Sequence, residues 1–467
     1  MRELLHKRDW TCEDRQNRPT ATSSDGAYTL SFVRGDAFVA DPDPLVVPKA
    51  ARRRGPTYAT SAETTLTSRS QTSPNTELLD PLRIQSARMR RGLSQAELAR
   101  RLGLTDRTVH RYETVGAPTR MGSKLSETLG FPDCFFERRP CVEFDAKAIS
   151  FRARRTTTKR QRAAAISAGS FGIEVDLWIS RRFGLPDVAV PDMTGESPRI
   201  AASLLRNFWG LGAKPLPNLV QLSESKGIRV NGLPDVAASV DAFSLWHGEI
   251  PHIFLAQRKT PERARFDLAH EIGHLLLHRR IGPESIKERQ ADEFASEFLV
   301  PTESIFERLR PNPTIDELMK AKRAFGVSAM ALTYAVHKAG RMTDWIYRST
   351  CCELARRGFQ SGEPEGMAGY ERSRVFPHVL SSSAQGPIST ARIARELALP
   401  LEDVHAAMLH TELLGLRSSV SASSPGGKCG DPRFDHSASG SDTAHSRRSA
   451  DRTERRRDCD SYRARSD

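Results

Sequence analysis

Apolar residues recur at helical spacing in the segment 80–136, and turn signals divide this segment into short helices. Ser94 followed by Glu97 is a capping box that opens one helix, and Gly103 ends it. Thr105 caps the next helix. The pattern therefore predicts three helices, over about 81–91, 95–102 and 106–113.

These helices would share one small core and leave a polar face outward. The predicted core residues are Ile84, Ala87, Leu93, Leu98, Ala99, Leu102, Leu104, Val109, Tyr112, Leu125 and Leu129. The outward polar set is Gln95, Asp106, Arg107, His110 and Arg111. A helix, a tight turn and a second helix form the arrangement that places one helix in the major groove of DNA. The alternative is an ordinary solvated helix face. Gly and Pro in 114–120 leave a fourth helix without a clear beginning.

A second helical pattern contains His270, Glu271 and His274 in the order H-E-x-x-H. Thr260 is the expected N-cap of this helix, and Pro261 fits its first position. On a helix this spacing places two imidazoles one turn apart with a carboxylate beside them, which are two zinc ligands and a general base. The alternative is a pair of surface histidines on a charged helix.

A protein zinc site needs a third ligand, and the next predicted helix offers several acids. Glu288 is the predicted ligand, with Glu293 and Glu297 as competitors. Asp292 lies one turn after Glu288, where it could hydrogen-bond the free ring nitrogen of a liganding histidine and fix its tautomer. His278 is expected to support the site or to lie at the surface, because a fourth protein ligand would close the site to water.

Three short runs of β-forming residues precede the histidine motif, at 227–230, 242–246 and 252–256. The turn 247–249 joins the last two, which predicts a small antiparallel sheet. An exposed edge strand can hold an extended peptide by strand addition, and 252–256 is the candidate for such a peptide cradle. A plain core hairpin is the alternative interpretation.

The rest of the ordered pattern is helical. Further helices are predicted at 158–183, from about 204, and at 315–325, 329–337 and 342–357. The segment 142–151 is expected to be extended, and internal repeats are not evident. The predicted fold class is mainly α with a small antiparallel sheet, in which an N-terminal helix-turn-helix bundle precedes an α+β domain of the zincin-like H-E-x-x-H type.

Composition describes a basic chain with polar ends. The formal net charge is +13 over 467 residues, which favours a polyanionic partner such as double-stranded DNA. Part of this charge lies in a tail where it could serve only solubility, at Arg447, Arg448, Arg455, Arg456 and Arg457. The segments 1–77 and 418–467 lack apolar periodicity and are expected to be disordered.

Cysteine usage and apolar run length bear on the compartment. The seven cysteines form no C-x-x-C pair, which argues against a disulfide framework and a structural zinc knuckle. No run reaches the roughly 18 apolar residues that span a bilayer, and the N-terminus has no signal-peptide core. We therefore expect a cytoplasmic protein without a membrane partner.

Two parts of the chain resemble known families. We identify a resemblance to the Cro/CI-type helix-turn-helix of the XRE regulator family in the stretch ARMRRGLSQAELARRLGLTDRTVHRYE. We identify a resemblance to the ImmA/IrrE family of zinc metallopeptidase-like proteins in DAFSLWHGEIPHIFLA, RKTPERARFDLAHEIGHLLLH and ERQADEFASEFLVP. The second resemblance covers roughly 197–380.

The XRE resemblance implies that the third helix enters the major groove. It implies that Gln95 touches the DNA backbone or a base. It also implies that Arg107, His110 and Arg111 lie at base edges or phosphates.

The ImmA/IrrE resemblance implies His270 and His274 as zinc ligands and Glu271 as catalytic base. It implies Glu288 as the ligand of the E-x-x-A-(N/D) segment, in which Asp292 stands where Asn is common. No Tyr or His is assigned as the group that would stabilise an oxyanion.

Together these features predict the domain order. The expected domains are a disordered extension at 1–77, the helix-turn-helix domain at 78–138, a linker with a long helix at 139–196, the metallopeptidase-like domain at 197–380, a small helical segment at 381–417 and a disordered basic tail at 418–467.

Two functions compete. In the first, the chain is a transcriptional regulator that binds an operator as a homodimer, and its zinc domain senses a signal or peptide. In the second, it is a zinc endopeptidase that cleaves a repressor or antitoxin protein. We favour the first, because a whole DNA-binding domain is indicated, whereas the substrate and the oxyanion group of a peptidase are not. The sequence does not indicate the operator or the signal.

Overall fold

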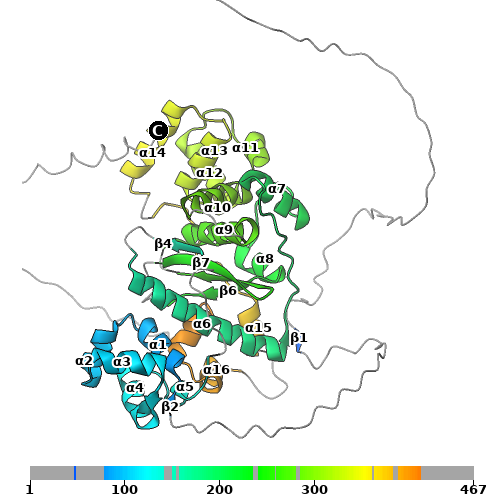
Figure 1. The fold of residues 1–467 in the computed structure, drawn as a ribbon. Coiled ribbons are helices and arrows are strands. Elements are labelled where there is room, and N and C mark those ends of the chain that lie inside the picture. The colour runs from blue at the N-terminus through cyan, green and yellow to red at the C-terminus, as the bar shows by residue number, and fades with distance from the viewer. Residues whose placement is uncertain are drawn as a thin grey trace, which may run out of the picture. The chain divides into compact units, whose positions relative to one another are not determined.

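Helices dominate the part of the chain that the structure describes (Figure 1). The computed structural model describes residues 47–48, 78–140, 150–153, 157–234, 240–257, 259–279, 284–359, 362–381 and 388–411. Most of the predicted disordered extension, most of the expected extended segment and the whole predicted basic tail lie outside these residues. Within the described part, no helix is both long and apolar enough to cross a membrane.

The three predicted helices of the N-terminal bundle form, and two further helices follow them. Its helices are α1 (Pro81–Arg90), α2 (Gln95–Leu102), α3 (Asp106–Thr114), α4 (Gly122–Leu129) and α5 (Asp133–Phe136). Asp80 caps α1, Ser94 and Glu97 form the capping box of α2, and Thr105 caps α3. Two residue pairs, β2 (Leu78–Leu79) and β3 (Ala117–Pro118), close the bundle as a short antiparallel ladder. The predicted core is confirmed, since all its residues are buried except Leu104, which is partly buried.

Aromatic residues that the sequence analysis did not assign extend this core to a long helix, α6 (Lys159–Arg182). The Phe131 and Phe135 rings each lie 5.7 Å from the ring of Phe171 on α6. The predicted helix at 158–183 therefore does more than connect domains. It packs the N-terminal bundle against the next layer.

A four-stranded sheet lies between α6 and the helices α9 and α10 (Figure 1). Its order is β4 (Ser150–Ala153), β7 (Val240–His247), β8 (Ile250–Leu255) and β6 (Arg229–Gly232). The β7–β8 pair is antiparallel as expected, and β4 adds to β7 as a further antiparallel strand that was not predicted, whereas β6 runs parallel to β8. The predicted edge position of 252–256 is wrong, because β8 is hydrogen-bonded on both sides.

Two glycines bring α6 close to this sheet. A Cβ at Gly169 would lie 2.7 Å from the Phe243 ring, and one at Gly172 would lie 2.9 Å from the Phe254 ring. Because real Cβ contacts are essentially never that short, both positions favour glycine. A second short ladder pairs β1 (Val47–Pro48) with β5 (Phe183–Gly184) at the end of α6.

The opposite face of the sheet carries α9 (Pro261–Leu277), which packs on α10 (Glu284–Leu299). Thr260 caps α9 and Pro261 begins it, as predicted. The remaining helices are α7 (Pro198–Phe208), α8 (Leu219–Ser225), α11 (Thr302–Arg308), α12 (Ile315–Phe325), α13 (Ala329–Lys338), α14 (Asp344–Arg356), α15 (Val375–Ser381), α16 (Thr390–Leu397) and α17 (Leu401–Ala407).

Candidate metal centre and DNA interface

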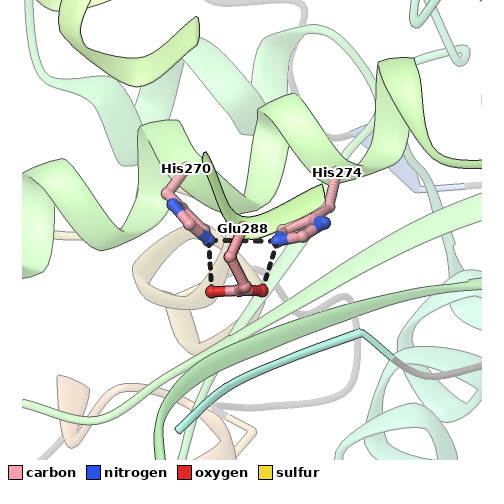
Figure 2. A group of neighbouring side chains, drawn as sticks. All are labelled: His270, His274 and Glu288. Carbon is pink, nitrogen blue, oxygen red and sulfur yellow. Dashed lines mark hydrogen bonds and ion pairs between the residues drawn. The ribbon is translucent and has the colours of Figure 1, made fainter. Parts of the chain in front are cut away.

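Two histidines of α9 and a glutamate of α10 converge on one point (Figure 2). The Nε2 atoms of His270 and His274 are 3.0 Å apart. Glu288 Oε1 lies 3.1 Å from His274 Nε2, and Glu288 Oε2 lies 3.5 Å from His270 Nε2. Both histidines are buried. Among the described residues, this is the group of His, Cys, Asp or Glu side chains close enough together to hold a metal ion.

Hydrogen bonds orient both imidazoles toward that point. Asp292 Oδ1 lies 2.9 Å from His270 Nδ1, so it accepts the ring proton and leaves Nε2 with a lone pair. His274 is held through a second histidine. His278 Nδ1 lies 3.0 Å from His274 Nδ1, and Gln290 Oε1 lies 2.9 Å from His278 Nε2. The Gln290 oxygen accepts from His278, which can then accept from His274, so His274 also presents a lone pair at Nε2.

This network contains the predicted supporting residues Asp292 and His278, together with Gln290. His278 contacts the far nitrogen of His274, away from the point of convergence, so it supplies neither a fourth ligand nor an oxyanion group there. Burial lowers the pKa of His278 to about 4, which keeps the ring neutral and able to accept. Gln290 was not predicted. Gln290 lies on α10, and it reaches His278 at the end of α9 only because α10 packs on α9.

The charge of Glu288 is held by its two partners. Burial raises the pKa of this carboxyl, but its interaction with the neighbouring imidazoles of His270 and His274 outweighs burial and holds the pKa well below its ordinary value. The competitor Glu297 instead accepts from the backbone N–H and the hydroxyl of Thr302, at 2.7 Å each, and so caps α11. The other competitor, Glu293, is not part of the converging group.

Glu271 is fully buried between α9 and the sheet. The hydroxyl of Ser244 on β7 donates to Glu271 Oε2 at 2.6 Å. Glu271 follows His270 directly on α9 and is not part of the converging group. Ser244 was not predicted as a site residue, because nothing in a β-strand pattern distinguishes a serine that faces a carboxylate.

The strand beside this carboxylate already has a neighbour on its outer side. The backbone of β4 pairs with β7, and Ser150 is in register with Ser244. An extended peptide that added to β7 would have to take the place of β4.

The polar face of α3 is open. Arg107, His110 and Arg111 are all exposed on α3, one helical turn or less apart. Gln95 is partly buried, and its amide donates to Glu113 Oε2 at 2.7 Å. Glu113 is buried and also binds the guanidinium of Arg88.

Glu113 therefore ties the end of α3 to α1 and to the start of α2. This carboxylate was not predicted as part of the interface, since its role depends on residues distant in the sequence. Its bonds to Gln95 and Arg88 hold α3 against α2 and α1.

Comparisons with known proteins agree with both parts of the chain. Residues 84–119 match the family described as helix-turn-helix, and residues 223–337 match the family described as the IrrE N-terminal-like domain. A search of curated proteins finds no match. The predicted fusion of an XRE-type helix-turn-helix with an IrrE-like metallopeptidase domain is confirmed, and so is the predicted fold class.

Proposed function

For a chain that carries a helix-turn-helix domain and an IrrE N-terminal-like domain, we propose a DNA-binding transcriptional regulator whose zinc site alters its affinity for an operator. The observation that carries this proposal is that an open recognition face on α3 and a convergent set of metal ligands occur in one folded unit. The partner is double-stranded DNA. We further propose a homodimer on two half-sites about one helical turn apart, which sedimentation of the protein–DNA complex would test.

The donor set fits zinc. Two neutral imidazoles and a carboxylate are a common protein set for a zinc ion that keeps an open position. Two nitrogen lone pairs 3.0 Å apart repel each other unless a cation lies near both, so the geometry favours a bound metal. Zinc would supply Lewis acidity and a more acidic bound water at this point.

The chain's own residues then divide the remaining work. Asp292 and His278 hold the two imidazoles in the tautomer that leaves Nε2 free. Glu271 is placed to take a proton, and the Ser244 hydroxyl holds its carboxylate in position.

An endopeptidase that cleaves a repressor or antitoxin is the second candidate. The position of Glu271 beside the ligands favours it. The pairing of β4 with β7 weighs against it, because it occupies the strand edge next to Glu271 to which an extended substrate would add. We therefore rank regulation by metal or signal binding above peptide cleavage.

The test measures zinc content and operator affinity of the purified full chain, with an operator duplex selected by the protein from a random-sequence pool. His270→Ala and His274→Ala should lose zinc, whereas Glu271→Gln should keep it, because a base is not a ligand. His378→Ala on α15 is the matched control and should keep zinc. Stoichiometric zinc in the double His270/His274 variant would contradict the proposed ligands.

Promoter response separates sensor from peptidase. If cleavage is the output, Glu271→Gln should keep zinc and DNA binding yet leave the promoter uninduced, since only proton transfer is lost. If metal or signal binding is the output, Glu271→Gln should respond normally and His274→Ala should fail. A normal response in both strains would refute any regulatory role of the site.

A further inference from the structure

The corner formed by α16 and α17 repeats the local geometry of the corner formed by α2 and α3. Ser94 and Ser389 cap helices of 8 residues each. Both helices end at a left-handed residue, Gly103 with φ 66° and Ala398 with φ 58°. No internal repeat was evident in the sequence, but the structure shows that these two corners share one local geometry.

The two stretches also correspond in sequence. Serine, alanine, arginine, leucine, valine and histidine recur at matching positions of 94–110 and 389–405. A helix-turn-helix of the same local design therefore lies at the C-terminal end of the described chain. Its partner has to be identified from its own side chains.

The second corner lacks the chemistry that binds DNA. The position of Arg107 on α3 is taken on α17 by Glu402, which is exposed, and the position of Arg111 is taken by Ala406, which is buried. Asp403 adds a second carboxylate to the first turn of α17. Acidic side chains repel phosphates, so this helix is not a DNA reader.

Those carboxylates instead meet the basic end of α1 in the DNA-binding bundle. Asp403 forms an ion pair with Arg90, and both side chains are almost fully buried, at 2% and 3% exposed. Glu402 forms a second pair with Arg91 at 2.5 Å. A buried ion pair adds little net stability, but it strongly disfavours any docking that leaves either charge unpaired. The pair therefore specifies one position of α17 on α1.

The other side of α17 lies on β6, the strand at the end of the sheet. Asn231 Nδ2 donates to the carbonyl of Ala407 at 3.4 Å. Gly232 allows the close approach, because a Cβ there would overlap the carbonyl oxygen of Ala406. From β6 the ladder continues through β8 to β7, where Ser244 binds Glu271.

We propose that α16 and α17 form a second helix-turn-helix whose partner is the DNA-binding bundle of the same chain, and that this docking couples the metal site to operator affinity. The proposal rests on the proposed function and specifies which contacts connect the metal site to the DNA-binding bundle. Contacts run without a gap from α1 through α17 and the sheet to the carboxylate beside the ligands, and both sites can bias the same packed element. Linkage then requires that zinc and operator change each other's affinity by one factor.

The test compares operator affinity with and without zinc in variants of the dock, which is the contact of α17 with α1 on one side and with β6 on the other. Arg90→Met combined with Asp403→Leu replaces the buried ion pair by apolar side chains, so no buried charge is left unpaired. Gly232→Ala pushes α17 away from β6 without touching α1. Glu353→Gln, which breaks an exposed ion pair on α14, is the control.

In the wild type and the control, removing zinc should change affinity for the selected operator duplex by roughly 5- to 150-fold. In both dock variants, zinc stoichiometry and operator binding should remain, while this ratio falls to near one. An unchanged ratio in the folded double variant would overturn the proposal and assign the coupling to α6, which also packs on α1. A ratio of one in the wild type would instead refute the proposed regulation itself.

Discussion

Gly273 lies between the two histidines of the metal site, on the side of α9 that faces α10. A Cβ at this position would lie 2.9 Å from Cδ1 of Phe294, 3.2 Å from its Cγ and 3.3 Å from its Cβ. Phe294 is fully buried and stacked on Phe298, with ring centroids 5.4 Å apart, so its ring has little room to move. Gly273→Ala therefore has to separate α9 from α10.

The size of the effect follows from this overlap. Adding a methyl group to a filled core costs about 1–3 kcal/mol, whereas alanine in a helix interior returns about 1 kcal/mol in folding stability. Separating the helices relieves the overlap but withdraws Glu288 from His270 and His274. Zinc binding must restore the overlap, so the strain appears in zinc affinity as a loss of roughly 5- to 150-fold.

Competition with a chromophoric chelator measures this loss directly. Gly122→Ala on α4 is the matched control, because its Cβ would lie 4.0 Å from the nearest side chain and leave the zinc site untouched. Gly273→Ala combined with Phe294→Leu should recover most of the affinity, since the smaller side chain leaves room for the methyl group. Wild-type zinc affinity in Gly273→Ala alone would refute the reasoning.

Three further predictions concern the interface, the ligand support and the pH dependence. Arg107→Ala or Arg111→Ala should weaken operator binding by about 1–3 kcal/mol if the side chain reads a base, and should weaken all duplexes alike if it contacts a phosphate; unchanged anisotropy titrations in the double variant would reject this face. Asp292→Ala should lower zinc affinity about 10- to 100-fold, because His270 loses the acceptor that fixes its tautomer, and equal chelator competition would contradict this. Burial raises the pKa of Glu224 from 4.5 to about 7, so the folded state favours the neutral form. As the pH rises from 4.5 to 7, the wild type should therefore lose roughly 3 kcal/mol of unfolding free energy relative to Glu224→Gln. Urea denaturation that gives the same pH dependence of unfolding free energy for both proteins would refute this.

Features that depend on neighbouring residues could be predicted from the sequence. The caps at Ser94, Thr105 and Thr260 each accept from the backbone N–H three residues further on, so their spacing alone predicts the helix starts. The spacing of His270 and His274 likewise fixes one face of one helix. These predictions needed no knowledge of how elements pack.

Features that depend on packing between distant elements could not be predicted. The interior position of β8 is set by β6, which reaches it as a parallel neighbour from earlier in the chain. Gln95 carries a side chain suited to DNA, yet Glu113 from the end of α3 takes its amide. Ser244 and Gln290 became site residues only because β7 and α10 dock on α9.

The two helix-turn-helix corners show why a local pattern predicts geometry better than it predicts a partner. Each corner needs only a cap, a left-handed residue and apolar positions at helical spacing, so the same signals produce the same turn twice. The partner depends on charge at a few outward positions, which is basic at Arg107 and acidic at Glu402. Because phosphates and guanidinium groups select opposite charges, the first corner suits DNA, whereas the second forms ion pairs with α1. The replacement of basic by acidic side chains at these few positions therefore suits the second corner to a contact within the chain.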